Sequence, residues 1–243
     1  MGRNPCRFWK EVRLFFLKKM KIICVGMNYA KHNEELKHTL AQVQGVSAGV
    51  QQLENAPTLF LKPETALTRE DWPFFVPDWS EQVEYETEIV VRINHLGKSI
   101  PERFAHRYYD EVTLGIDFTA RDIQKQLSQK GLPWEIAKGF DGASYVGKWV
   151  KLDDLKKDKN SEKSPIQDLH FEMQLNGETR QQGWSGDMLH TVDQIISYAS
   201  QFYLLKTGDL IFTGTPAGVG RVQEGDLITA SLEGIPVLEC RCK

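Results

Sequence analysis

The stretch VEYETEIVVRI, residues 83–93, decides the fold because it carries two patterns at once. Its odd-numbered positions are mostly apolar, and its even-numbered positions begin with Glu84, Glu86 and Glu88. A period of two predicts a half-buried β-strand. Side chains two residues apart on one face lie roughly 6–7 Å from each other, so three like charges are crowded there. A strand whose glutamates simply face water is the default interpretation.

A bound cation is the alternative, because no lysine or arginine is interleaved among the three glutamates. Hard divalent ions take oxygen ligands, often a few carboxylates plus water. Two carboxylates leave several coordination positions open, and a substrate can complete the shell. Asp117 ends the predicted strand VTLGID, residues 112–117, and is a candidate third ligand; an ordinary turn aspartate is the competing interpretation.

Strands outnumber helices along the chain. Further strands are predicted at 21–26 and 57–63, in DLIFTGTP and in DLITASL, and Asn176-Gly177 predicts a tight hairpin. One helix is expected after Thr119, capped by that residue with Asp122, buried along Ile123 and Leu127, and stopped by Gly131 and Pro133. A second is expected over about 192–205, with a capping box of Thr191 and Gln194. The elements do not alternate as in a doubly wound sheet, which predicts a β-rich α+β domain.

Composition narrows the function classes. The chain has 243 residues, 41% of them hydrophobic, and a formal net charge of -3, which gives no general case for nucleic-acid binding. No apolar run approaches the roughly 20 residues of a membrane span. The four cysteines form no C-x-x-C pair, so we expect reduced thiols in a cytoplasmic protein.

The first nineteen residues differ from the rest. They are basic, with a short apolar patch and neither the long apolar core nor the cleavage site of a secretory signal. We expect residues 1–19 to be a tail outside the fold and residues 20–243 to form one domain.

Other motifs are weaker. GTPAGVG, residues 214–220, matches neither G-x-x-x-x-G-K-[ST] nor G-x-G-x-x-G, which disfavours nucleotide binding. Its two interpretations are a tight turn and a backbone cradle for a small anion. G-x-S-x-G occurs once, as GVSAG at residues 45–49, but in a stretch that looks like a loop or a weakly formed helix rather than the strand-to-helix turn that presents a serine nucleophile. H-E-x-x-H does not occur, which disfavours a zinc site. His32 and Glu35 are three residues apart and would be neighbours on a helical turn, as a general-base pair or as two surface residues.

Taken together, five stretches resemble the fumarylacetoacetate hydrolase family. They are GMNYAKHNEEL, TLFLKPETAL, EYETEIVV, GIDFTARDIQ with GLPWEIAKGFD, and LIFTGTPAGVG, in the family's order and from Met20 nearly to the C-terminus. The resemblance implies that Glu86, Glu88 and Asp117 bind Mg²⁺ or Mn²⁺. Glu84 is not part of the family's glutamate pair and is expected to be solvated.

The same resemblance implies roles for six other residues. Lys138 matches the active-site lysine, and His32 with Glu35 matches a water-activating pair on a lid over residues 27–56. Arg121 and Gln124 match substrate-contacting positions. Thr215 would bind the substrate carboxylate with help from backbone N–H groups. The family often has arginine where this chain has Met27.

The fold that the resemblance implies is a mixed β-sandwich roll with short peripheral helices, usually a homodimer. The implied function is a metal-dependent hydrolase that cleaves a C–C bond in a small acylpyruvate-like acid. An isomerase or decarboxylase of the hydroxyheptadienedioate, hydroxymuconate or oxaloacetate type is the alternative, and a non-catalytic binding protein on the same fold is the second alternative.

Overall fold

The computed structural model describes residues 20–30, 56–69, 72–156 and 164–243. The predicted tail, 1–19, lies outside the described residues. So does most of the predicted lid, 27–56, because only residues 27–30 and 56 of it are described.

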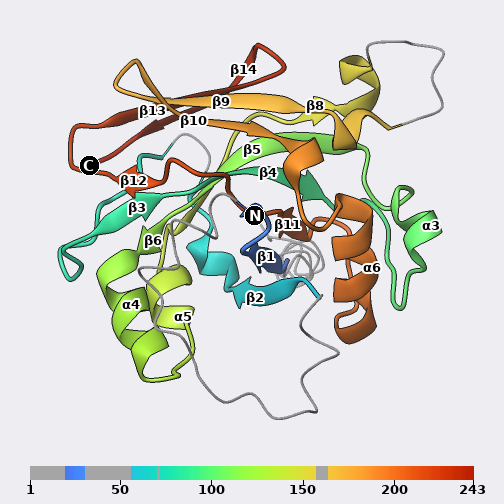
Figure 1. Ribbon diagram of the computed structural model, residues 1–243, viewed down its shortest axis with the longest axis horizontal. Coiled ribbons are helices and arrows are strands. Elements are labelled where there is room, and N and C mark those ends of the chain that lie inside the picture. Colours follow the sequence, from blue (N-terminus) through green and yellow to red (C-terminus); the bar gives the residue numbers. More distant parts are fainter. Residues whose placement is uncertain (1–19, 31–55, 70–71, 157–163) are drawn as a thin grey trace, which may run out of the picture.

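The described chain is built mainly from three sheets (Figure 1). The largest holds β1 (Ile22–Gly26), β2 (Thr58–Lys62), β4 (Thr87–Arg92), β5 (Glu111–Asp117), β7 (Ser144–Val146), β8 (Val150–Lys151) and β11 (Leu210–Phe212). The second holds β9 (His170–Leu175), β10 (Glu178–Trp184), β13 (Leu227–Leu232) and β14 (Ile235–Arg241), and the third β3 (Val83–Tyr85), β6 (Thr119–Ala120) and β12 (Gly220–Arg221). The strand order of the largest is β2-β1-β11-β4-β5-β7, with β8 also on β5.

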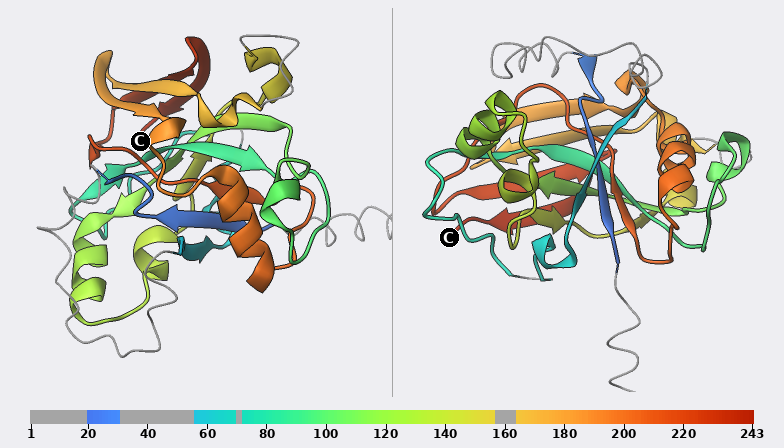
Figure 2. Two further views of the ribbon diagram at one scale, coloured as in Figure 1. Left: turned by 45° about the vertical axis from the view of Figure 1, so that its right-hand side comes forward. Right: turned by 90° about the horizontal axis from the view of Figure 1, so that it is seen from below.

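Short helices lie around these sheets. They are α3 (Glu102–Ala105), α4 (Arg121–Gln129), α5 (Glu135–Lys138) and α6 (Val192–Phe202). Helices α4 and α5 lie together at one end of the molecule and α6 lies towards the other, with β1 and β2 between them (Figures 1 and 2). The predicted class, a β-rich α+β sandwich with peripheral helices, is confirmed.

The main core lies between the largest sheet and the four-stranded sheet. Ile89 and Val91 of β4 belong to the same buried cluster as Phe171 and Met173 of β9. Val90, on the opposite face of β4, packs in a second cluster with Cys24, Phe212 and their neighbours. Both faces of β4 are therefore buried.

The stretch 83–93 is not the half-buried strand that its alternation predicts. Every residue from Val83 to Val91 is buried. The stretch also breaks at Glu86: β3 before it pairs with β6 and β12, whereas β4 after it pairs with β5 and β11. The neighbouring segment of the same chain is interrupted opposite this point, at Phe118 between β5 and β6. Both segments therefore pass from one sheet to another at the same place.

Local signals are confirmed in part. Asn176 and Gly177 have the positive φ angles of a type I′ turn and join β9 to β10, and Thr191 with Gln194 forms the capping box of α6. The expected cap of α4 is wrong, because Thr119 belongs to β6 and Ala120 precedes the helix without a side-chain cap.

The buried face of α4 also differs from the prediction. Its buried residues are Arg121 and Gln124, while Ile123 and Leu127 are only half-buried. Arg121 is buried because it forms ion pairs with the carboxylates of Glu84 and Glu86.

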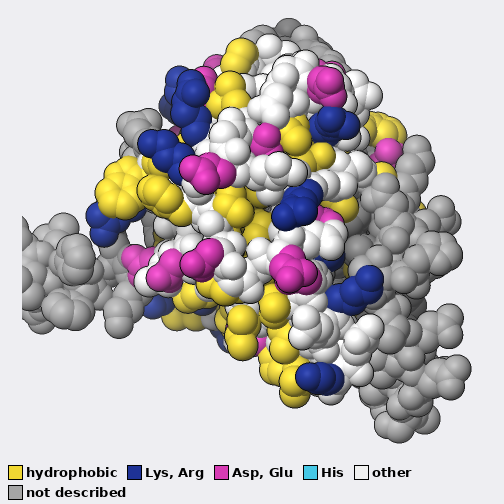
Figure 3. Space-filling view, turned by 90° about the vertical axis from the view of Figure 1, so that its left-hand side faces the viewer, with side chains coloured by type: hydrophobic (Ala, Val, Ile, Leu, Met, Phe, Trp, Pro, Cys, Tyr) yellow, Lys and Arg dark blue, Asp and Glu magenta, His cyan; other side chains and the backbone are white. Residues whose placement is uncertain are grey.

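One face of the molecule shows how its charges are distributed. On the face shown in Figure 3, basic and acidic side chains are interspersed with apolar ones. Within the described residues, no helix is long and apolar enough to cross a membrane.

Candidate active site

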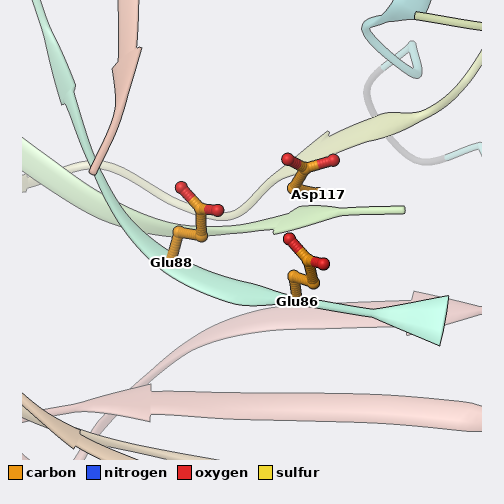
Figure 4. Close-up of side chains that lie close together, drawn as sticks. All are labelled: Glu86, Glu88 and Asp117. Atoms are coloured by element: carbon orange, nitrogen blue, oxygen red, sulfur yellow. The ribbon is translucent and has the colours of Figure 1, made fainter. Parts of the chain in front are cut away.

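Glu86, Glu88 and Asp117 converge on one point, and strand pairing explains why. Thr87 lies opposite Ile116 and Glu88 opposite Gly115, and the Asp117 N–H donates to the Glu86 carbonyl at 2.8 Å. Glu86 and Asp117 are thus cross-strand neighbours, and Glu88 lies two residues further along the same face. The three carboxylates point toward one another (Figure 4). One ligand oxygen from each lies within 4.8 Å of the other two, and all three residues are buried.

The donor set fits a hard dication. Buried carboxylates this close repel one another unless a cation lies between them, and three oxygen ligands leave coordination positions for water or a chelating acid. The three residues are brought together as the sequence predicts; their role as metal ligands stays a prediction.

Lys138 lies directly beside this cluster. Its ammonium nitrogen is 2.7 Å from Glu86 Oε2 and 3.0 Å from Asp117 Oδ2. Burial alone lowers the pKa of this lysine, but Asp117 and Glu86 outweigh it and raise the pKa above its ordinary value. Lys138 is therefore a buried, protonated cation in contact with two predicted metal ligands.

Arg121 covers the cluster from the first turn of α4. It donates through Nε to Glu84 at 2.7 Å, through NH1 to Gln124 at 2.6 Å, and through NH2 to Glu86. Burial opposes its charge, but Glu86 and Glu84 raise its pKa. The prediction that Glu84 is solvated is wrong: it is 8% exposed because Arg121 pairs with it.

Lys62, the last residue of β2, is a further cation that the sequence interpretation missed. Its side chain is fully buried, and its nitrogen lies 2.6 Å from Asp117 Oδ1 and donates to the Ala143 carbonyl at 2.7 Å. Its only sequence signal is its place in TLFLKPETAL, since a lysine before a proline otherwise looks like an exposed strand end.

Glu88 has a different environment from its two neighbours. Within the described part of the chain no lysine or arginine forms an ion pair with it, and it accepts a 2.7 Å hydrogen bond from the Gly214 N–H. Burial, then Asp117 and Glu86, raise its pKa, and Lys138 with the Gly214 N–H only partly offsets this.

The turn Gly214-Thr215-Pro216, called the GTP turn after its sequence, is held to β4 by a buried glutamine. Gln181 accepts from the Thr87 N–H at 2.9 Å and donates to Thr215 Oγ1 at 2.8 Å and to the Pro216 carbonyl at 3.0 Å. Thr215 in turn donates its hydroxyl hydrogen to the Thr87 carbonyl. A carboxylate bound at this turn would therefore rely on backbone N–H donors rather than on the Thr215 hydroxyl.

A pocket opens over the cluster, with an empty volume of about 390 Å³ that includes its open mouth. Its polar lining unites seven predicted residues: Glu86, Glu88, Asp117, Arg121, Gln124, Lys138 and Thr215. Its apolar lining is Val25, Met27, Phe60 and Trp134, with Gly26. His32 and Glu35 lie outside the described residues, so the predicted dyad is not placed.

Comparison with known proteins gives one consistent family. The sequence model of the fumarylacetoacetate (FAA) hydrolase C-terminal family matches residues 21–243. The mouse protein named oxaloacetate tautomerase FAHD1, mitochondrial, is 35% identical over 240 residues, covering 98% of this chain and 95% of its own. Oxaloacetate tautomerase YcgM of Escherichia coli K12 is 34% identical, covering 88% of this chain and 89% of its own.

Solved structures agree with the sequence relatives. Fumarylpyruvate hydrolase from Pseudomonas aeruginosa, in complex with Mn²⁺ and pyruvate, has a TM-score of 0.76 and 29% identity, covering 92% of this chain and 89% of its own. The 2-hydroxyhepta-2,4-diene-1,7-dioate isomerase from Mycobacterium marinum has a TM-score of 0.70 and 29% identity, covering 92% of this chain and 74% of its own.

Proposed function

This chain belongs to the fumarylacetoacetate hydrolase family, and on that premise we propose that it is a metal-dependent enzyme that stabilises the enolate of a short 2-oxo acid. One observation carries the proposal: three buried carboxylates converge in a pocket and are backed by buried cations. Mg²⁺ or Mn²⁺ would be held by Glu86, Glu88 and Asp117. Once bound, the ion supplies Lewis-acid polarisation of the 2-oxo group.

Lys138 supplies the second electrostatic contribution. An ammonium group has three N–H donors, and Glu86 and Asp117 accept two of them. The third can reach a substrate oxygen that gains negative charge as a proton leaves the neighbouring carbon. A fixed donor in a dry pocket stabilises such charge more than water does.

Keto–enol tautomerisation of an oxaloacetate-like acid is the reaction that these groups favour. It needs an enolate, a proton moved between carbon and oxygen, and no attacking water. Relatives that span nearly the whole chain carry this activity in their names. The described groups would stabilise the charge of the enolate, and the predicted His32–Glu35 pair would take the proton from carbon and return it.

Hydrolysis of an acylpyruvate-like acid is the second candidate. It would use the same enolate as leaving group and the predicted His32–Glu35 pair to activate water. A similar structure named as a fumarylpyruvate hydrolase, solved with Mn²⁺ and pyruvate, favours it. The isomerase and decarboxylase alternatives share the enolate, whereas a non-catalytic protein would not need the intact set of acids and lysines.

A parallel assay separates these reactions. Purified protein with Mn²⁺ or Mg²⁺ is given oxaloacetate, and the ultraviolet band of its enol form is followed; acetylpyruvate is tested beside it, with product analysis for pyruvate and acetate. Faster enol–keto conversion that EDTA removes supports the tautomerase. Metal-dependent release of pyruvate and acetate would move the assignment to the hydrolase, and unchanged rates with EDTA would remove the metal from both.

Assembly and location belong to the same proposal. We propose a homodimer in the cytoplasm, from the family resemblance and from the free thiols of the three cysteines that the structure describes, Cys24, Cys240 and Cys242. Light scattering on the purified protein measures the first, and fractionation of cells that make it measures the second.

A further inference from the structure

Lys62 touches a predicted metal ligand without lining the pocket. Its side chain is fully buried between β2 and Asp117, 2.6 Å from Oδ1. Burying an ammonium group is expensive, and the exposed end of an edge strand would have placed it in water at no cost. Its position therefore needs an explanation that the fold alone does not give.

The cations around the cluster follow a pattern that includes Lys62. Asp117 meets Lys62 at one oxygen and Lys138 at the other. Glu86 meets Arg121 at one oxygen and Lys138 at the other. Both predicted ligands therefore form ion pairs with cations of the protein at both of their oxygens.

The net charge of the cluster depends on whether a metal ion is bound. Glu84, Glu86, Glu88 and Asp117 carry four negative charges, against three positive charges on Lys62, Lys138 and Arg121. The cluster is therefore close to -1 without a metal ion and close to +1 with a divalent one. A metal-loaded cluster with surplus positive charge attracts an anionic acid, while the same lysines and arginine repel the incoming metal.

We propose that Lys62 couples the metal to the substrate: it weakens binding of the metal alone and strengthens binding of the anionic acid once the metal is present. The inference rests on the proposed function and names Lys62 as a residue that acts through Asp117 and through its charge. By linkage, an anionic acid then tightens the metal by the same factor as the metal tightens the acid.

Opposite changes in two affinities test this role. Isothermal titration calorimetry measures the Kd of Mn²⁺ alone, and then the Kd of oxalate, a stable dianion, at saturating Mn²⁺. In Lys62→Met we expect Mn²⁺ to bind at least about tenfold more tightly and oxalate at least about tenfold more weakly, because a full charge a few ångströms away is removed. Lys62→Arg keeps the charge and should move both values much less.

A matched control comes from the neighbouring strand. Lys21 precedes β1, pairs with Asp209 at 2.5 Å, and is not among the residues that line the pocket. Lys21→Met should leave both Kd values unchanged. If Lys62→Met does not fold, Lys62→Gln keeps a donor for the Ala143 carbonyl and makes the same test.

Each outcome decides the role. If both affinities weaken, Lys62 only holds the fold and the coupling is refuted; unchanged affinities refute it as well. Wild-type protein that binds Mn²⁺ and oxalate but turns over no 2-oxo acid would overturn the proposed function and leave the coupling intact. Wild-type protein that binds no Mn²⁺ would overturn both.

Discussion

Replacing Glu88 with glutamine should stabilise the metal-free protein while destroying the metal site. Glu88 is 1% exposed, lies within 4.8 Å of two other carboxylates, and has the Gly214 N–H as its hydrogen-bond donor. Glutamine keeps the shape and the acceptor oxygen but removes the charge. The repulsion between residue 88 and the carboxylates of Glu86 and Asp117 then disappears. The predicted metal site also loses one of its three charged ligands.

The magnitude follows from Coulomb's law. Two unit charges 4.8 Å apart interact by about 3.5 kcal/mol at an effective dielectric constant of about 20. Glu88 faces two such neighbours, and Lys138 offsets part of the effect. We expect a net gain of about 1–3 kcal/mol for Glu88→Gln, which for a chain of this size corresponds to a Tm rise of about 2–12 °C.

Thermal unfolding in EDTA and in Mn²⁺ measures both effects. Wild-type Tm should rise when Mn²⁺ is added, and the Tm of Glu88→Gln should be higher than wild type in EDTA yet insensitive to Mn²⁺. Since burial raises the pKa of Glu88, metal-free wild type should also gain stability as the pH falls through that raised pKa, and the variant should lose this gain. Exposed Glu224→Gln is the control. A lower Tm for Glu88→Gln in EDTA would refute the reasoning.

Three other substitutions test separate parts of the structure. Asp117→Asn removes a charged ligand while keeping the side-chain shape, and should weaken Mn²⁺ binding in calorimetry at least about a hundredfold; retained affinity would exclude Asp117 as a ligand. Gln181→Leu leaves the buried Thr87 N–H without its acceptor, so we expect a loss of about 1–3 kcal/mol in denaturant unfolding and a raised KM from displacement of the GTP turn; an unchanged KM would separate that turn from substrate binding. Thr191→Ala breaks the capping box of α6 and should lower stability by about 1 kcal/mol with unchanged turnover, since α6 contributes no residue to the pocket lining; a change in turnover would contradict this independence.

Sequence patterns located the acidic cluster because strand geometry is local. A period of two places Glu86 and Glu88 on one face, and a strand ending at Asp117 is readable from VTLGID. The pairing that brings Asp117 opposite Glu86 is not local, and only the resemblance joined the three. The structure supplies that pairing through the bond from the Asp117 N–H to the Glu86 carbonyl.

Burial of charge was the part that patterns could not predict. Alternation says that one face of 83–93 is polar, and a polar face is read as exposed unless its partners are known. Those partners are Arg121 and Lys138, which lie 35 and 52 positions from Glu86 along the chain. In isolation, a lysine or an arginine looks solvent-exposed. The expected cap of α4 is wrong for a related reason, because Thr119 belongs to β6 and pairs with Glu84 of β3 instead of starting the helix.

The pairing of β1 with β11 has a consequence for how the chain is synthesised. The two strands run parallel, Ile22 beside Leu210, and the Lys21–Asp209 contact that closes their end spans 188 positions. While a ribosome is still making the chain, β1 has only β2 as a sheet neighbour until almost the last strands have emerged. Contacts this distant in sequence form late and slowly. We therefore expect nascent chains released before β11 to keep β1 unprotected, and chaperones or proteases to meet this protein at that stage.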